Sequence, residues 1–402
     1  MKIIFFTENN RAGGMDKFLI TLIKNWPNKD DELILICNKN HPGLIDLERD
    51  LPNKVLIIKH SIQLNWSFCS PVIEILPKLI QRIFRQMMRI LLAPYQFYKI
   101  RTMFKELNGD RLLTVNGAYP GGETCRLSNI AWYALGLGIS IHNIHNFALK
   151  PRFIFSWYER YIDKMLIKSC KYFVTVSKSC SESLFDRLRS NNENIVTIYN
   201  GLDFKPNLSS NHHKVLRELN ITHRKDVLIM LGTYEERKGH EFLLRAMQLV
   251  FNAKPHLHLL ICGTGTHKEK EIIESNIKKY IPGKNIHLLG FVQDAETLIS
   301  SSYILLIPSQ DQESFGLTAV EAMQRGIPVV TTDVGGLSET IGPDGFCGYI
   351  CNKSNIECFS KKILYLIDNK DIYKNMSNNG IKRSKELFTS KRMVNEYFKL
   401  LN

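Results

Sequence analysis

The chain has 402 residues, 44% of them hydrophobic, and a formal net charge of +14 at pH 7. This length suggests two or three globular domains with full cores, and no apolar run reaches the roughly 18 to 20 residues of a spanning helix, which disfavours an integral membrane protein. The charge indicates an anionic partner, although composition alone leaves nucleic acid, a membrane surface and a phosphorylated substrate open.

The nine cysteines are scattered without paired spacing, and no signal peptide precedes the first predicted strand. We therefore expect reduced, mostly buried thiols in a cytoplasmic protein. Cys347 and Cys351 are close in sequence, but no second pair or histidine cluster accompanies them, so we expect two small core residues rather than a zinc site.

The first half of the chain alternates short apolar runs with helical stretches. Residues 2–7 predict a strand, Gly13 and Gly14 a turn, and the amphipathic run 16–26 a helix. Further strands are predicted at 32–37, 54–59, 111–115, 139–144, 172–176 and 195–199. Strands that alternate with helices pair in parallel, so we expect a doubly wound α/β layer.

A basic segment at 75–105 interrupts this half with seven Lys or Arg and no Asp or Glu. Four cations recur at helical spacing and form one stripe: Lys78, Arg82, Arg85 and Arg89. Apolar residues such as Ile80 and Met87 form another face, and more aromatic residues follow Pro94. A basic amphipathic helix of this kind lies on an anionic membrane, and the alternative is a helix packed on its domain with the stripe in solvent. We favour membrane contact.

Two histidines, His142 and His145, stand near the end of the strand predicted at 139–144. Residues three apart on a strand face opposite sides, so both cannot easily serve one site, and no nearby carboxylates indicate a metal. We expect His142 to be a hydrogen-bonded core or surface residue.

The turn-rich segment 200–207 breaks the pattern and indicates a domain boundary. Strands are then predicted at 226–231, 256–261, 285–289, 303–307 and 328–332. Each ends in a glycine or Pro-Ser turn, at Gly232, Gly263, Gly290, Pro308-Ser309 and Gly335-Gly336. Ligands of open parallel sheets bind beyond the carboxyl ends of the strands, so these loops predict a nucleotide site.

The segment 308–330 carries two glutamates, Glu313 before a predicted helix and Glu321 inside it, with Gly316 at the helix start. The helix start favours an anion, and a glycine there lets a phosphate approach the backbone. Glu321 stands among apolar residues and needs partners, which sugar or ribose hydroxyls would supply. The alternative is an acidic first turn and a buried Glu paired with an Arg.

This segment resembles the signature of glycosyltransferase family 4, whose members have the GT-B fold. Further matches follow in the expected order: Gly13-Gly14, Val176-Ser177, residues 196–203, Gly232 with Arg237-Lys238-Gly239, Cys262 to Gly265, and Leu289-Gly290-Phe291. The resemblance implies two facing Rossmann-like domains with a cleft between them. It places an N-terminal acceptor-side domain at 1–203, a nucleotide-sugar domain at 204–385 and a helix at 386–402 that returns to the first domain through Tyr397, Phe398 and Leu401.

The resemblance also implies residue roles. Glu321 would hold the ribose hydroxyls and Glu313 would face the donor sugar, while Lys238 would neutralise the diphosphate and its leaving charge. His145 matches the family's cleft histidine, which approaches the donor sugar. Backbone amides around Phe315, Gly316 and Leu317 would bind donor hydroxyls and phosphate, and Gly13, Gly14, Gly232, Gly290 and Phe291 belong to the donor-binding loops.

One position departs from the family pattern. Many members have an arginine directly after the glycine that corresponds to Gly232, and this chain has Thr233. Arg237 would then supply the second cation, with a solvated surface charge as the equal alternative. Such enzymes need no divalent metal, and no Asp-x-Asp motif at a strand end calls for one here. Retention of configuration is implied by the resemblance alone, through a front-side displacement without an assigned nucleophile.

The sequence therefore predicts a hexosyltransferase that moves a sugar from a UDP- or GDP-sugar to a glycan or lipid-linked glycan, in lipopolysaccharide O-antigen or capsule synthesis. We expect it on the cytoplasmic face of the inner membrane. A sugar-nucleotide epimerase of related fold would bind the same donor without an acceptor. A non-enzymatic basic protein that binds membrane or nucleic acid is a further alternative, although no nucleic-acid motif is evident.

Overall fold

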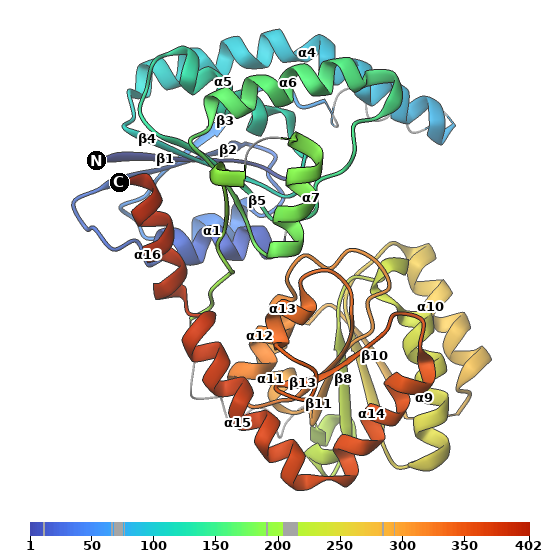
Figure 1. Ribbon diagram of the computed structural model, residues 1–402. Coiled ribbons are helices and arrows are strands. Elements are labelled where there is room, and N and C mark those ends of the chain that lie inside the picture. The colour runs from blue at the N-terminus through green and yellow to red at the C-terminus, as the bar shows by residue number, and fades with distance from the viewer. Residues whose placement is uncertain are drawn as a thin grey trace. The chain divides into compact units, whose positions relative to one another are not determined.

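The structure is a computed structural model that describes residues 1–10, 13–65, 67, 75, 77–189, 192–203, 216–283, 285–292 and 294–402. The chain forms two compact units (Figure 1). Unit 1 comprises Met1–Gly201 together with Ser390–Asn402, and unit 2 comprises Leu202–Thr389. The chain thus passes between the units twice, close to the boundaries expected after residues 203 and 385.

Unit 1 is built on a parallel sheet of seven strands in the order β3-β2-β1-β4-β5-β6-β7. The strands are β1 (Lys2–Glu8), β2 (Glu32–Asn38), β3 (Leu56–His60), β4 (Arg111–Asn116), β5 (Ser140–Ile144), β6 (Tyr172–Thr175) and β7 (Ile195–Thr197). All seven were predicted from their apolar runs. Because the order reverses between β1 and β4, the loops that follow these strands diverge and leave room for a ligand at this switch point.

Helices cover both faces of this sheet. They are α1 (Gly14–Lys24), α2 (Leu44–Asp50), α4 (Lys78–Leu107), α5 (Glu123–Ala134), α6 (Ser156–Ser169), α7 (Lys178–Leu188) and α16 (Ser390–Leu401). Ile4 and Phe6 of β1 pack in a core with α4 to α7, whereas Ile3 and Phe5 pack with α1 and α16 on the other face (Figure 1). Alternate residues of a strand point to opposite faces, so an almost wholly apolar β1 is what a sheet covered on both sides requires.

Helix α4 departs from the sequence prediction at Arg89. We expected this residue in a basic stripe on a membrane, but its side chain is only 6% exposed, and its Nε lies 3.0 Å from Oε2 of Glu123. The guanidinium also donates to the carbonyl of Gly121. The prediction of membrane contact through Arg89 is therefore wrong, because a helical period cannot tell a buried ion pair from a solvated charge.

The remaining stripe residues of α4 differ among themselves. Lys78 and Arg82 are exposed, and Arg85 is half-buried. The helix also continues through Pro94. Proline removes one backbone hydrogen bond inside a helix, and burial of Gln96, Ile100 and neighbouring side chains against the rest of unit 1 offsets that loss.

Unit 2 has a six-stranded parallel sheet in the order β10-β9-β8-β11-β12-β13. The strands are β8 (Val227–Leu231), β9 (His258–Cys262), β10 (Ile286–Gly290), β11 (Ile304–Ile307), β12 (Val329–Thr332) and β13 (Gly348–Cys351). Five of these were predicted, and β13 was missed because it has four residues and begins with glycine. The switch point of this six-stranded sheet lies between β8 and β11, so the loops after these two strands come together.

The helices of unit 2 are α9 (His240–Ala253), α10 (His267–Tyr280), α11 (Ala295–Ser300), α12 (Leu317–Gln324), α13 (Leu337–Ile341), α14 (Ile356–Asp368) and α15 (Lys370–Leu387). The terminal helix expected at 386–402 is interrupted at Phe388 and Thr389. After this break α16 belongs to unit 1, where Tyr397 and Leu401 are buried and Phe398 packs edge-on against Trp26.

The sequence predicted that the cysteines are reduced thiols, but two of them are not. Cys351, at the end of β13, and Cys358, in α14, form a disulfide. The other six described cysteines, Cys347 among them, are free and buried. No helix among the described residues combines the length and the apolar character needed to cross a membrane.

Candidate functional site

The switch point of unit 2 brings together two loops that are 75 residues apart in sequence. The Nζ of Lys238, in a short turn of helix (Glu236–Lys238) after β8, lies 2.5 Å from Oε2 of Glu313 in the loop after β11. The hydroxyl of Ser309 donates to the same carboxylate oxygen at 3.2 Å. Both partners of the ion pair are largely buried, so a cation and an anion are held close together at the carboxyl end of the sheet.

Glycines allow the close approach of these loops. Gly239 has a φ of 76°, and a Cβ atom there would stand 1.9 Å from the carbonyl oxygen of Pro308. The stem of Lys238 passes over Gly232, whose added Cβ would lie 3.6 Å from Lys238 Cδ. A backbone hydrogen bond of 2.8 Å from Gln310 to the carbonyl of Arg237 joins the two loops. The left-handed backbone at Gly239 is therefore needed to bring Lys238 to Glu313.

Helix α12 begins at Leu317, with Gly316 as its N-cap in the left-handed conformation (φ 85°). A Cβ on Gly316 would meet Leu337 Cδ2 at 2.7 Å. The first N–H groups of a helix have no carbonyl to bond within the helix, so this end of α12 offers donors and a positive dipole to an anion. The side chain of Phe315 is buried and packs edge-on against Phe388, so it holds the loop in place.

Glu321 lies in the second turn of α12 and is buried. The arginine four residues later, Arg325, donates to the backbone carbonyl of Glu321 and pairs at 2.7 Å with Glu296. The sequence left open whether a buried Glu321 would pair with an arginine or with ribose hydroxyls, and the ribose role stays a prediction.

Arg237 is not a purely solvated surface charge. Its Nε lies 2.5 Å from Glu235, and another guanidinium nitrogen donates to the carbonyl of Gln312 at 3.1 Å. The side chain thus bridges the loops after β8 and β11. Whether it also serves as the second phosphate cation stays a prediction, as does the effect of Thr233, whose buried hydroxyl has no partner among the described residues.

Gly290 is the last residue of β10, at the edge of the sheet of unit 2, and Phe291 follows it. Gly290 has a φ of 70°, and its carbonyl accepts a hydrogen bond of 2.8 Å from the amide of Gly263. Gly263 in turn has no room for a side chain, since its Cβ would overlap the carbonyl oxygen of Gly232. The loops after β8, β9 and β10 therefore form one continuous rim, and Phe291 stands exposed on it.

In unit 1, Gly13 is the N-cap of α1, and Gly14 is the first residue of that helix. Asp16 fixes this glycine loop, because one carboxylate oxygen accepts the amide of Gly13 at 3.0 Å and the other lies 2.8 Å from Nε2 of His41. Both glycines are exposed, and a Cβ on Gly13 would meet nothing within 4 Å. Gly13 therefore borders open space rather than packed protein.

The two histidines of the β5 region have different surroundings. His142 is fully buried, with Nδ1 2.8 Å from Asn129 and Nε2 3.3 Å from Asn116, which confirms it as a hydrogen-bonded core residue. The His145 ring packs 4.4 Å from that of Phe18, and its buried Nε2 has no hydrogen-bond partner among the described residues. Burial lowers the pKa of His145 to about 3, so the imidazole is neutral and its free nitrogen can meet a hydroxyl.

Three residues of these loops were not predicted as site residues. Ser309 and Gly239 were named only as parts of a turn and a loop motif, and both belong to the Lys238–Glu313 arrangement. Glu8 ends β1 at the switch point of unit 1, and its carboxylate accepts the amide and hydroxyl of Thr124 at the start of α5. A polar residue at the end of an apolar strand next to the switch point was the signal that could have identified Glu8.

Comparison with known proteins finds a family similarity in unit 2. Residues 212–383 match the family model Glycosyl transferases group 1. The matched residues include the loops that hold Lys238, Glu313 and Gly316, so the geometry and the family model concern the same part of the chain.

Curated relatives match between about half and two thirds of the chain at low identity. The capsular polysaccharide biosynthesis glycosyltransferase CapM of Staphylococcus aureus is 24% identical over 290 residues, 69% of this chain and 73% of CapM. The N-acetyl-alpha-D-glucosaminyl L-malate synthase of Bacillus anthracis is 26% identical over 206 residues, and this match spans 51% of the chain and about half, 53%, of that enzyme.

Solved structures resemble the entire chain. HepE of Anabaena, solved in complex with UDP, has a TM-score of 0.77 at 17% identity and is matched over 100% of this chain and 99% of its own. A glycosyltransferase of Rickettsia africae has a TM-score of 0.79 at 19% identity, over 99% and 97% of the two chains. Both Rossmann-like sheets thus belong to a GT-B arrangement of domains, which confirms the predicted fold class.

Proposed function

We propose that the chain is a retaining glycosyltransferase that moves a hexose from a nucleotide-diphosphate sugar to a glycan or lipid-linked glycan in cell-surface polysaccharide synthesis. The observation that supports this most is the Lys238–Glu313 pair beside the N-terminus of α12, inside the segment that matches the group 1 family model. CapM makes capsular polysaccharide and HepE was solved with UDP, which favours the same process and a UDP-linked donor here.

In this proposal the donor separates the ion pair. The diphosphate takes Lys238 and the start of α12, and Glu313 is released to accept hydrogen bonds from the sugar hydroxyls. When the bond between the sugar carbon and the phosphate oxygen breaks, negative charge grows on the diphosphate, and a fixed cation with a helix N-terminus stabilises it. Glu321 would bind the ribose hydroxyls, and no divalent metal would be needed.

The acceptor would bind to unit 1. The open glycine loop at Gly13 and the neutral His145 lie at the carboxyl ends of β1 and β5, where parallel sheets bind ligands, and both would face the donor, as the resemblance implies. His145 would contact a sugar hydroxyl through its unpaired Nε2. The exposed Lys78 and Arg82 of α4 would contribute to contact with an anionic membrane, which would place the enzyme at the cytoplasmic face of the inner membrane.

Donor binding is tested by thermal shift with UDP, GDP and ADP and their sugars. A ligand that binds only the folded protein raises its stability in proportion to the logarithm of concentration over Kd. We expect a selective shift with one nucleotide, which Lys238→Ala and Glu321→Ala reduce. Lys268→Ala removes an exposed lysine from α10 of the same unit and should keep the full shift.

Two outcomes would refute this assignment. If both site variants retain the wild-type shift, the donor binds elsewhere. If the bound sugar nucleotide is isomerised but never transferred or hydrolysed, the epimerase alternative holds instead.

A further inference from the structure

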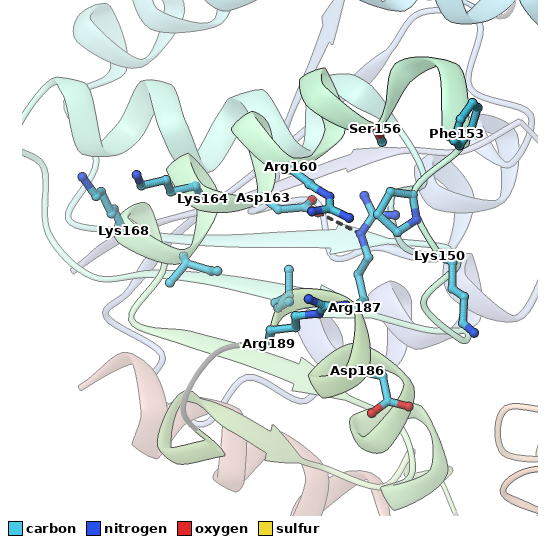
Figure 2. A pocket seen from close by; sticks show the side chains of 13 residues that line it. Lys150, Phe153, Ser156, Arg160, Asp163, Lys164, Lys168, Asp186, Arg187 and Arg189 are labelled. Carbon is cyan, nitrogen blue, oxygen red and sulfur yellow. Dashed lines mark hydrogen bonds and ion pairs between the residues drawn. The ribbon is translucent and has the colours of Figure 1, made fainter.

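A cavity of about 760 Å³ opens on unit 1 (Figure 2). It is bounded by α6, by the C-terminal end of α7 and by the segment 150–153 that precedes α6. Most of the charged side chains that line it are basic, and they come from all three segments: Lys150, Arg160, Lys164, Lys168, Arg187 and Arg189.

One of these cations is already neutralised. Arg187 lies 2.8 Å from both Asp163 and Glu159, and it also donates to the carbonyl of Leu149. Figure 2 shows Arg187 directed at Asp163 on the cavity wall. Arg187 is therefore engaged by two buried acids and adds no free positive charge to the cavity.

The other five cations have no ion-pair partner within the part of the chain that the structure describes. The only further acid on the lining is Asp186. Lys150 stands on one side of the cavity and Lys164 and Lys168 on the other, so positive charge surrounds the opening (Figure 2). A concave surface lined by one sign of charge concentrates counter-ions, and this one favours an anion with several charged oxygens.

An exposed apolar row borders the same cavity. Phe153 is 94% exposed, Ile154 65%, Trp157 64% and Tyr161 59%, and Phe153 also lines the cavity. At 100° per residue, Trp157 and Tyr161 lie on the same outward face of α6 as Lys164 and Lys168. The opposite face of α6, which includes Ile162 and Leu166, is buried in the core of unit 1.

This combination determines the kind of partner. Globular proteins seldom expose several large aromatic residues side by side, and Trp and Tyr next to basic residues are typical of surfaces at the interface of a bilayer. A soluble phosphate compound would explain the cavity but not the exposed row, whereas an anionic phospholipid supplies both a phosphate and an apolar phase.

We propose that this face of α6 binds an anionic bilayer: the row Phe153, Ile154, Trp157 and Tyr161 enters the interface, and the basic cavity takes the phosphate of a lipid headgroup. The surface uses residues other than the α4 stripe considered above. The proposal deepens the membrane contact of the proposed function and rests on it in that respect, but it involves no residue of unit 2 and can be tested without a sugar nucleotide.

The test is co-sedimentation of the full chain with vesicles of phosphatidylcholine, with and without 30% phosphatidylglycerol. Two double variants change the surface: Phe153→Ser with Trp157→Ser, and Lys164→Gln with Lys168→Gln. Because each basic residue near an anionic surface contributes about one kcal/mol, the lysine pair should lower the affinity roughly tenfold or more. The aromatic pair should do the same, and all four changed side chains are exposed, so folding is preserved.

Matched controls separate this surface from net charge. Lys268→Gln with Lys278→Gln removes the same charge from exposed positions of α10 in unit 2, and its vesicle affinity should stay within about twofold of wild type. UDP binding should be unchanged in every variant, which keeps a failure here distinct from a failure of the donor site. Trp157→Phe should still bind vesicles but lose the blue shift of tryptophan fluorescence that accompanies binding.

Three results would overturn the proposal. The first is equal vesicle binding by wild type and both double variants of α6. The second is equal binding to vesicles with and without phosphatidylglycerol. The third is protection of the cavity lysines from acetylation by inorganic pyrophosphate but not by anionic vesicles, which would make the cavity a site for a soluble phosphate compound.

Discussion

The two units share one architecture but place their charged groups differently. In unit 2 the notable pair, Lys238 and Glu313, lies in loops at the carboxyl end of the sheet. In unit 1 charged side chains are buried beneath the helices, where Arg89, Arg126 and Arg187 alternate with Glu123, Glu159 and Asp163 across α4 to α7. The same fold thus places an ion pair in the loops at the carboxyl end of the sheet in one unit and a buried charge network beneath the helices in the other.

The buried network fixes the layer from which the exposed aromatic row projects. Burial alone would raise the pKa of Glu123, but the nearby guanidinium groups of Arg126 and Arg89 hold the pKa below its usual value. Three arginines and three acids balance in charge, and a complete network of this kind is tolerated where an incomplete one is costly.

The largest effect should come from breaking this network. Arg126→Met leaves Glu123 with one guanidinium and Asp163 with another, and removal of one partner of a buried ion pair costs about 3–5 kcal/mol. All four tryptophans lie in residues 1–201, so their fluorescence during urea unfolding reports on unit 1. The matched control is Arg101→Met, an exposed position of α4, which should change the midpoint little. Equal midpoints for the two variants would contradict the role of the network.

Loop geometry in unit 2 should give the next effect. Gly239→Ala and Gly283→Ala both place an alanine in the left-handed region, at φ 76° and 69°, which costs about 1–2 kcal/mol. Only Gly239→Ala adds a clash, with the carbonyl of Pro308, so it should destabilise unit 2 by about 3 kcal/mol or more and weaken UDP binding. Scanning calorimetry and UDP titration measure both quantities. If the two variants behaved alike, the contact between the loops would not matter.

A smaller effect is expected from pH. Burial, with Arg126 nearby, lowers the pKa of His142 to about 3, whereas an unfolded chain has a histidine pKa of about 6.5. Below pH 6.5 the unfolded state therefore binds a proton that the folded state does not, and stability falls with pH down to about 3. Between pH 7 and 5, His142 should contribute about 1–2 kcal/mol of this loss in unit 1. The urea midpoint of His142→Gln should depend less steeply on pH, and parallel profiles would count against a buried neutral His142.

Much of the fold followed from the sequence because parallel strands covered on both faces are short apolar runs with clear ends. The switch point and the family resemblance also brought Lys238, Glu313 and Gly316 to one end of unit 2. The sequence could not reveal that Arg89 is buried, because its partner Glu123 lies 34 positions away and each residue alone resembles a surface charge. Strand β13 was not predicted because its four residues are too few to show a clear apolar run.

The exposed apolar row at the start of α6 was not predicted, for a related reason. An exposed Trp157 and a core tryptophan look the same in a sequence, and helical spacing alone does not say which face of α6 is covered. Only the packing of Ile162 and Leu166 into unit 1 shows that the opposite face, with its lysines, is exposed.

The most direct test of the account is release of nucleoside diphosphate from a panel of UDP- and GDP-sugars, in the presence of EDTA and with anionic vesicles supplied. We expect release from one class of sugar nucleotide, reduced at least a hundredfold in Lys238→Ala because a cation that stabilises the leaving group is lost. Lys268→Ala should retain wild-type turnover. Release by Lys238→Ala at the wild-type rate, or no turnover of any sugar nucleotide by the wild type, would contradict a donor site at the switch point of unit 2.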